Sequence, residues 1–446
     1  MWSLYGRSYD LTPFLALHPG GSLALSMGQG QKDSTQIFEQ YHPNNLTSAL
    51  QILAKYALEP STSTTGKGAA ATTPQQPPDS PSSTPPSSIH STTQTTDPFH
   101  KDLMELLRQT GDTKASPLAF LLSLAGAVLL CWVWVQWAHG SLAALLVLPF
   151  LHWLAAVNIA HDANHFALSK HPWINELMGF IGAPLFFNSG QWYHQHNVAH
   201  HQHTNVVGKD HDLHHFGDHS RLHVGVPWAP PHAMQVAFMA FAFPLATFVQ
   251  CCIFPARLLA GWGFLNQPEG KEGGGAAKEG HHHLAQRTRL ATTLQLAMSW
   301  GVIAYPLWAW GISWGSLAWG AYPYAIAGVV FMAVTQVSHI QEVAQQNTTG
   351  TPLHWARQQV STSVDYSQGS AMVTFLTGAL NMQSLHHCFP GVHSSRLRAM
   401  YPAFREVCRK HGVAVHEVGS FWEALGGYGA HLARMSRKGV EGGKVD

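Results

Sequence analysis

The sequence predicts a mostly helical membrane protein preceded by a small α+β unit. Two features of the composition indicate the membrane and a metal site, while the α+β fold of the small unit follows from motifs described below. Only 11% of the residues are charged while 46% are hydrophobic, which favours a membrane, and the chain holds 31 histidines, which favours metal binding. Lys+Arg (25) and Asp+Glu (24) nearly balance, which argues against a nucleic-acid binder. The five cysteines lack CxxC spacing, so a disulfide framework is not expected, which fits a reducing compartment.

Changes in composition divide the chain into four parts. Residues 1–59 form a small polar unit. Residues 60–96 are rich in Ser, Thr and Pro with almost no apolar side chains, and such a segment cannot bury enough surface to offset its ordering entropy. We therefore expect a disordered linker there, followed by a membrane domain at 97–425 and a C-terminal tail at 426–446.

Four stretches of the membrane domain are apolar enough to cross a bilayer, which needs about 20 residues. They are 118–138, 141–160, 290–311 and 315–338, and a fifth apolar stretch is 233–254. The turns at His139–Gly140 and near Ser313 carry no Lys or Arg, whereas basic residues occur before, between and after the two pairs of spans. The positive-inside rule then predicts two hairpins that dip in from the cytosol, with 233–254 in the interface or re-entrant.

Three histidine clusters fall on the cytosolic side of this topology. The first is "HDANH", the second lies in "HQHNVAHH", and the third is "QSLHH", while one more histidine ends the last span. Histidines at i, i+4 share one helix face, so both rings of such a pair can reach one metal ion. Eight histidines exceed the about four to six ligands of one ion, so a pair of metals is expected, although imidazole does not choose among zinc, copper and iron. The candidate ligands are His161, His165, His196, His200, His201, His339, Gln383, His386 and His387.

These HxxxH, HxxxHH and QxxHH boxes, placed between paired spans, resemble those of the membrane-bound fatty acid desaturases. The resemblance covers about 97–420. It implies two iron ions held by the boxes, with His339 as a further ligand, and activation of O₂ to remove hydrogen from an unactivated methylene. Where the family often has Asn one turn before that histidine, this chain has Thr335.

The third box begins with Gln383 rather than histidine, as in "NMQSLHHCFP". This pattern is similar to that of the front-end desaturases, which insert a double bond between an existing one and the carboxyl end of the acyl chain. An amide oxygen is a weaker ligand than imidazole, so Gln383 could bind one iron, hold a water or orient a neighbour.

The N-terminal unit carries two further histidines, His18 in "FLALHPGG" and His42 in "FEQYHP". The HPGG motif with a downstream histidine resembles cytochrome b5, in which both histidines are axial haem ligands. The resemblance covers 1 to about 59, and the helix and strand that normally precede Trp2 in that fold are missing. A unit this small has a core of marginal stability unless a bound group such as haem stabilises it.

Together the resemblances imply an oxidoreductase: an O₂-dependent front-end desaturase of polyunsaturated acyl chains, at the Δ5 or Δ4 position. They imply a di-iron centre, haem b, an acyl-lipid or acyl-CoA substrate, and NADH–cytochrome b5 reductase as the electron source. The expected location is the endoplasmic reticulum membrane with the site facing the cytosol, or alternatively a plastid membrane. Sphingolipid desaturase and fatty acyl hydroxylase use the same scaffold, and a histidine-rich metal transporter is the alternative outside the enzymes.

Overall fold

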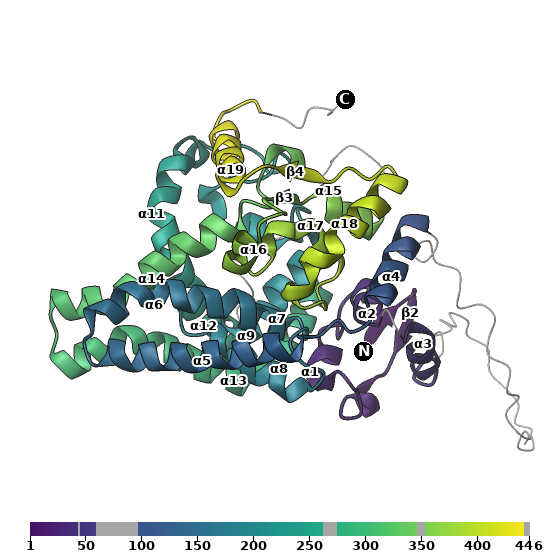
Figure 1. Ribbon diagram of the computed structural model, residues 1–446, viewed down its shortest axis with the longest axis horizontal. Helices are drawn as coiled ribbons and strands as arrows, with labels where there is room; N and C mark the ends of the chain where they lie inside the picture. Colours follow the sequence, from purple (N-terminus) through teal and green to yellow (C-terminus); the bar gives the residue numbers. More distant parts are fainter. Residues whose placement is uncertain (43–44, 59–96, 262–273, 346–352, 441–446) are drawn as a thin grey trace, which may run out of the picture.

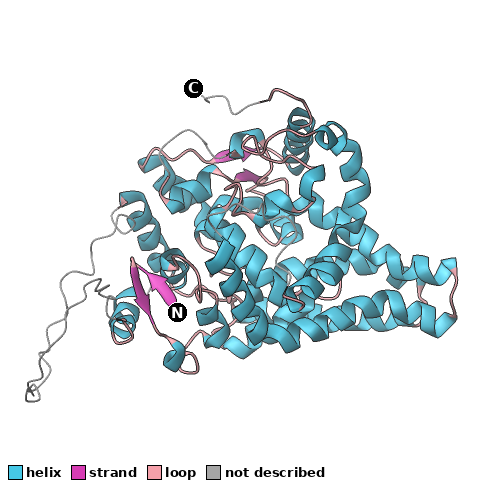
Figure 2. Ribbon diagram, turned by 180° about the vertical axis from the view of Figure 1, so that it is seen from behind, coloured by secondary structure: helices cyan, strands magenta, loops and turns pink. Residues whose placement is uncertain are grey.

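The computed structural model describes residues 1–42, 45–58, 97–261, 274–345 and 353–440. The linker expected at 60–96 lies outside these residues. Helices dominate, and the described strands are four short ones in two separate pairs (Figure 2). The mostly helical fold with a small N-terminal sheet, as expected from the sequence, is confirmed.

The N-terminal unit is a hairpin followed by three short helices. Strands β1 and β2 pair antiparallel through a two-residue turn in which Tyr5 and Gly6 both have positive φ, the geometry that matches the twist of a hairpin. Trp2, Leu4, Tyr9 and Leu53 are buried in its own small core. The elements are β1 (Trp2–Leu4), β2 (Arg7–Tyr9), α1 (Gly21–Ser26), α2 (Thr35–Tyr41) and α3 (Leu46–Ala54).

The membrane domain is built on two helical hairpins that lie side by side, with both tips at the same end (Figure 1). The first is α5 (Pro117–Ala138) with α6 (Leu142–Ala155), and the second is α13 (Gly274–Trp310) with α14 (Trp314–Thr335). Ser116, Ser141 and Ser313 cap the starts of α5, α6 and α14 with their side chains. The Tyr305 hydroxyl donates to the Ala138 carbonyl (3.1 Å), which joins the two hairpins near their tips.

Four helices of the described residues are long and apolar enough to cross a membrane: Pro117–Ala138, Leu142–Asn164, Pro230–Leu259 and Trp314–Thr335. Three match expected spans. The segment expected in the interface, 233–254, belongs to the fourth, while the expected span 290–311 lies in α13 and is not among them. Buried polar side chains explain the lower hydropathy of α13, because Thr292, Gln295 and Ser299 face the rest of the protein rather than lipid.

Beyond the hairpins, α11 (Gln235–Phe248) packs along α14 and α12 (Phe254–Leu259) packs against α13, while most of the other helices gather over one end of the bundle and form a cap. Its small parallel sheet pairs β3 with β4. Segments η2 (Ala156–Ala160) and η4 (Tyr193–His200) are π-helical, a geometry that occurs mostly as single turns at functional sites. The other elements of the membrane domain are α4 (Pro98–Thr110), α7 (His161–Asn164), α8 (Pro172–Gly179), α9 (Ser189–Trp192), α10 (His201–His203), α11 (Gln235–Phe248), α12 (Phe254–Leu259), α15 (Trp355–Ser361), β3 (Val364–Tyr366), α16 (Ala371–Thr377), α17 (Gln383–Cys388), α18 (Ser394–Lys410), β4 (His416–Val418) and α19 (Phe421–Met435).

Helix α19 corrects the expected end of the membrane domain. A tail was expected from residue 426, but α19 runs through that point to Met435. Its Tyr428, Leu432 and Ala424 are buried against α11 and the β3 region, which holds the helix in place. The folded domain therefore extends at least to Met435.

Candidate metal centre and haem pocket

Two groups of buried histidines lie where the cap meets the hairpins. His161, His165, His196 and His386 form the first group, and their ring nitrogens lie within 4.8 Å of one another. His200, His339 and His387 form the second group under the same limit. Both groups combine residues from segments far apart in the chain.

The three histidine boxes of the sequence contribute residues to the two groups in different ways. The pair His161 and His165 enters one group, as the i, i+4 spacing predicts. His196 and His200 have the same spacing, but they lie on π-helical η4 and enter different groups. The adjacent His386 and His387 on α17 also separate, since neighbours on a helix point in different directions.

His201 lies between the two groups. Its Nε2 is 3.1 Å from Nε2 of His196 in the first group, and its ring stacks on that of His387 in the second (centroids 4.2 Å apart, 14° between planes). The remaining candidate, Gln383, belongs with the second group, because its amide nitrogen lies 2.9 Å from Nε2 of His339 and its Oε1 is buried without a partner.

The spacing of the nitrogens suits metal binding. Nε2 of His165 and Nε2 of His196 are 3.0 Å apart, and Nε2 of His200 and Nε2 of His339 are 3.3 Å apart. Metal–imidazole bonds are about 2.1 Å long, so two nitrogens bound at a right angle lie about 3.0 Å apart. The groups therefore have room for one ion each without a change in backbone.

Hydrogen bonds at Nδ1 aim several rings into the groups. His339 donates from Nδ1 to the Thr362 carbonyl (3.0 Å), which can only accept, so its Nε2 keeps a lone pair. Nδ1 of His387 contacts Oε1 of Gln359 (2.7 Å), and Nδ1 of His200 lies 3.1 Å from both carboxylate oxygens of Asp210. Such partners fix the ring orientation of metal-binding histidines.

Burial keeps most of these rings neutral. It lowers the pKa of His339 to about 4, and it lowers the pKa values of five further histidines, given at the end of this paragraph, well below the ordinary value. His200 differs, because the carboxylates of Asp210 and Asp212 outweigh burial and raise its pKa to about 9. The set of strongly lowered pKa values comprises His165, His196, His201, His386 and His387.

Polar contacts from the second hairpin position the second box. Asn188 caps α9 and donates to the Thr292 carbonyl (2.9 Å), while the Ser189 backbone N–H donates to the Gln295 amide oxygen (2.8 Å). The polar stripe of α13 thus holds the start of the helix that carries His196 and His200.

A narrow pocket opens beside both groups, with a volume of 30 Å³. His161 and His196 from the first group and His200, His339 and Gln383 from the second reach it. Thr335 also lines it, but its hydroxyl donates to the Phe331 carbonyl (2.8 Å) within its own helix. The apolar wall is made of Trp153, Val157, Phe186, Phe187, Trp192, Phe331 and Leu380.

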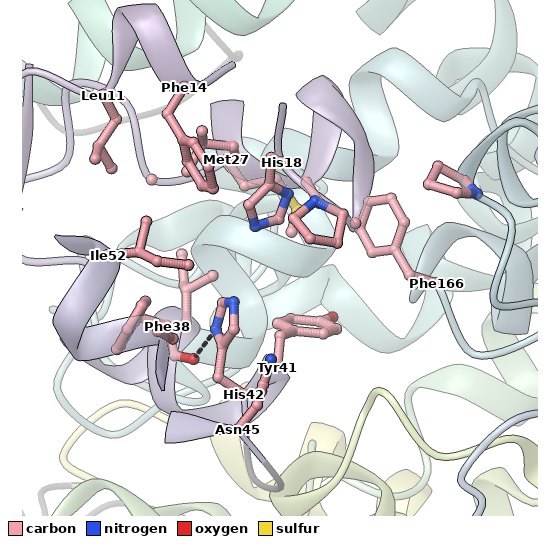
Figure 3. Close-up of a pocket in the computed structure, with 18 of the residues that line it drawn as sticks. Leu11, Phe14, His18, Met27, Phe38, Tyr41, His42, Asn45, Ile52 and Phe166 are labelled. Atoms are coloured by element: carbon pink, nitrogen blue, oxygen red, sulfur yellow. Dashed lines mark hydrogen bonds between the residues drawn. The ribbon is translucent and has the colours of Figure 1, made fainter. Parts of the chain in front are cut away.

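A larger cavity of 280 Å³ lies in the N-terminal unit, with His18 and His42 on opposite sides (Figure 3). Each ring uses Nδ1 on a backbone carbonyl, that of Gly21 (3.0 Å) for His18 and that of Phe38 (2.6 Å) for His42, which leaves both Nε2 atoms free to bind. The ring centroids are 6.0 Å apart. Two nitrogens bound to one iron at about 2.0 Å place the centroids about 6 Å apart, so the pair fits bis-histidine haem ligation.

Asp210, Gln359, Thr362 and Tyr41 were not among the expected site residues. Tyr41 reaches the first group from the N-terminal unit, with its hydroxyl 3.3 Å from Nδ1 of His165. Only Asp210 had a signal in the sequence, since it follows the second box closely in "HQHTNVVGKDHD". The other three approach from distant segments and have no local pattern.

Comparison with known proteins agrees with this geometry. The family model described as fatty acid desaturase matches residues 132–419, more than half of the chain. The model described as cytochrome b5-like heme/steroid binding domain matches residues 1–58.

Curated relatives match almost the whole chain. An acyl-lipid omega-13 desaturase of Chlamydomonas reinhardtii is 34% identical, covering 95% of this chain and 92% of the relative. An acyl-lipid (8-3)-desaturase of Mortierella alpina is 26% identical, covering 96% and 92%. A Delta(5) fatty acid desaturase A of Dictyostelium discoideum is 25% identical, covering 96% and 89%.

Proposed function

Because this chain belongs to the fatty acid desaturase family and carries an N-terminal cytochrome b5-like domain, we propose that it is a front-end acyl-lipid desaturase. It inserts a cis double bond between an existing double bond and the carboxyl end of a polyunsaturated acyl chain. One observation carries the proposal. Two adjacent groups of imidazole nitrogens face the same narrow pocket with its apolar wall, so two metal ions and one methylene group of a substrate can meet there.

We assign two iron ions to the histidine groups. His161, His165, His196 and His386 hold one, and His200, His339 and His387 with Gln383 hold the other, while His201 lies between them. The irons supply the activation of O₂ that breaking an unactivated C–H bond requires. The chain's own contribution is to keep most of the rings neutral, to orient them, and to keep water out with the aromatic wall of the pocket.

We assign haem b to the cavity between His18 and His42, with electrons from NADH through a cytochrome b5 reductase. The free Nε2 atoms and the spacing of the two rings support this assignment. The domains are then a haem domain at 1–59 and a desaturase domain from residue 97, joined by the segment 60–96. The candidate membrane helices make this a membrane protein, and we propose the endoplasmic reticulum with the metal centre on the cytosolic side.

For the position of the double bond we propose Δ5 rather than Δ4. The name of the Dictyostelium discoideum relative states Delta(5). The name of the Chlamydomonas reinhardtii relative counts from the methyl end, as omega-13. On an 18-carbon chain the thirteenth bond from the methyl end begins at carbon 5, so both names indicate the same position for a substrate of that length.

The test is expression in a yeast that makes no polyunsaturated lipid, fed separately with 18-carbon and 20-carbon polyunsaturated acids. Lipid classes are separated and analysed by gas chromatography–mass spectrometry with localisation of double bonds. We expect a new cis bond at carbon 5 of an 18-carbon chain in a glycerolipid. A bond on the methyl side of the existing ones, or a hydroxylated product, contradicts the front-end assignment.

The matched control is His386→Ala, which removes a proposed ligand of the first group. It should express at the same level and give no product. A product that persists in this variant would show that the host, rather than this chain, performs the reaction.

A further inference from the structure

The cavity between His18 and His42 is not closed by the N-terminal unit alone. Residues of the desaturase domain form part of its wall: Lys114, Phe166, Ser169, Lys170, Pro172 and Asn175. Figure 3 shows the Phe166 ring to the right of His18, and its centroid lies 6.0 Å from that of Tyr41. A ligand in this cavity therefore touches both domains.

Specific contacts hold the two domains together around the cavity. The Tyr41 hydroxyl lies 3.3 Å from Nδ1 of His165, and Glu39 lies 3.2 Å from Nε2 of His100 on α4. Gly21 packs so closely on Pro172 that an added Cβ would lie 2.8 Å from it. The cavity wall that the two domains form together is thus part of a specific interface between them.

Phe166 lines the cavity in a backbone conformation of high free energy. Its φ is +56°, which a bulky residue adopts only where the surroundings impose it. The turn lets His165 point into the first metal group while the next residue packs between Tyr41 and Tyr193. One tight turn therefore serves both sites.

Lys114 brings a positive charge to the same wall. Its Nζ donates to the carbonyls of Phe166 (2.9 Å) and Gly391 (3.3 Å), which use two of its three donors and neutralise none of its charge. In the part of the chain that the structure describes, the salt bridge of Asp112 goes to Lys170 (3.0 Å), and no carboxylate oxygen lies within 4 Å of Nζ of Lys114. Burial lowers the pKa of Lys114 to about 8, and the charge of Asp112, which is paired with Lys170, offsets this lowering only in part.

We propose that the desaturase domain supplies part of the haem site, with Phe166 packing on the haem and the Lys114 ammonium binding one of its carboxylates. This inference rests on the assignment of haem to the cavity. Haem carries two carboxylates and an apolar ring, which match the charge and the aromatic wall. Haem binding then favours the docked arrangement of the two domains by mass action.

The test uses the full-length protein with Lys114→Gln, which keeps an N–H donor for the two carbonyls and removes the charge. Lys114→Arg is the rescue variant. Lys101→Met, an exposed lysine on α4, is the matched control. Three quantities are measured: haem per chain, the rate of haem transfer to excess apomyoglobin, and the midpoint potential of the haem.

We expect Lys114→Gln to release haem about tenfold faster, the effect of losing one hydrogen bond between charged groups. Its midpoint potential should move to more negative values, because a lost positive charge disfavours the reduced haem. Lys114→Arg should stay near wild type in both quantities, and so should Lys101→Met.

Wild-type release and potential in Lys114→Gln would overturn the proposal. So would lower thermal stability with an unchanged potential, because that result assigns Lys114 only to packing. A wild-type protein that holds no haem would instead refute the haem assignment itself, so the two failures are distinguishable.

Discussion

Asp210→Asn is the most informative single substitution at the metal centre. The carboxylate is fully buried and accepts from three groups: Nδ1 of His200 (3.1 Å to each oxygen), the backbone N–H of Asn205 (2.8 Å) and that of Asp212 (2.9 Å). The two backbone donors bind different oxygens. An amide has only one oxygen, so whichever way it turns, one of the two N–H groups faces an NH₂ group.

The magnitude follows from this count. A buried donor without an acceptor costs about 1–3 kcal/mol. Loss of the carboxylate behind a metal-binding histidine lowers metal affinity by about 10- to 100-fold. We therefore expect Asp210→Asn to be destabilised by about 2 kcal/mol and to keep its iron poorly, with loss confined to the group that contains His200.

The assay is non-haem iron per chain after dialysis against a chelator, together with thermal unfolding of the detergent-solubilised protein. Asp218→Asn is the matched control, because Asp218 lies exposed in the same loop. Iron content close to wild type in Asp210→Asn, or equal losses in both variants, would refute the role given to Asp210.

Three further predictions concern other parts of the molecule. Gln383→Ala should lower non-haem iron from about two towards one per chain and lower desaturation, measured together; full non-haem iron and full activity would show that Gln383 is dispensable. His42→Ala should abolish the haem absorbance band and leave non-haem iron unchanged, and a retained band would place the haem elsewhere. Burial raises the pKa of Asp365 to about 6, above the unfolded value of about 3.9. The protonated carboxyl group therefore contributes its full stabilisation below about pH 4. This contribution, about 3 kcal/mol in all, is lost as the pH rises to about 6. Subtracting unfolding curves of Asp365→Asn from wild type between pH 4 and 7 measures this slope, and a flat difference contradicts it.

The sequence predicted which histidines lie close together at the candidate metal centre, but not how they divide into two groups. Spacing along one helix predicted that His161 and His165 act together. His196 and His200 have the same spacing and their rings stack 5.5 Å apart, yet they enter different groups. Their division depends on which histidines other segments bring to each ring, and the spacing of the box does not contain that information.

Contacts between distant segments could also not be predicted from the sequence. Tyr41 meets His165 across 124 residues, and Nδ1 of His387 meets Gln359 across 28. The same limit applies to the spans. Hydropathy placed 290–311 in the membrane, but could not show that Thr292 and Gln295 turn inward to bind the second box. Periodicity of apolar residues reveals local structure, whereas partners across the fold depend on packing.

The burial of the histidine groups has a consequence for how iron leaves the protein. All eight proposed ligands, and His201 between the two groups, are buried, and several rings are fixed by Asp210, Gln359 and Thr362 from separate segments. A chelating molecule cannot reach an ion there until part of the cap opens. Exchange of the two proposed iron ions is then governed by the opening rate of the fold, and we expect the protein to retain them for longer than the equilibrium affinity of individual imidazoles would imply.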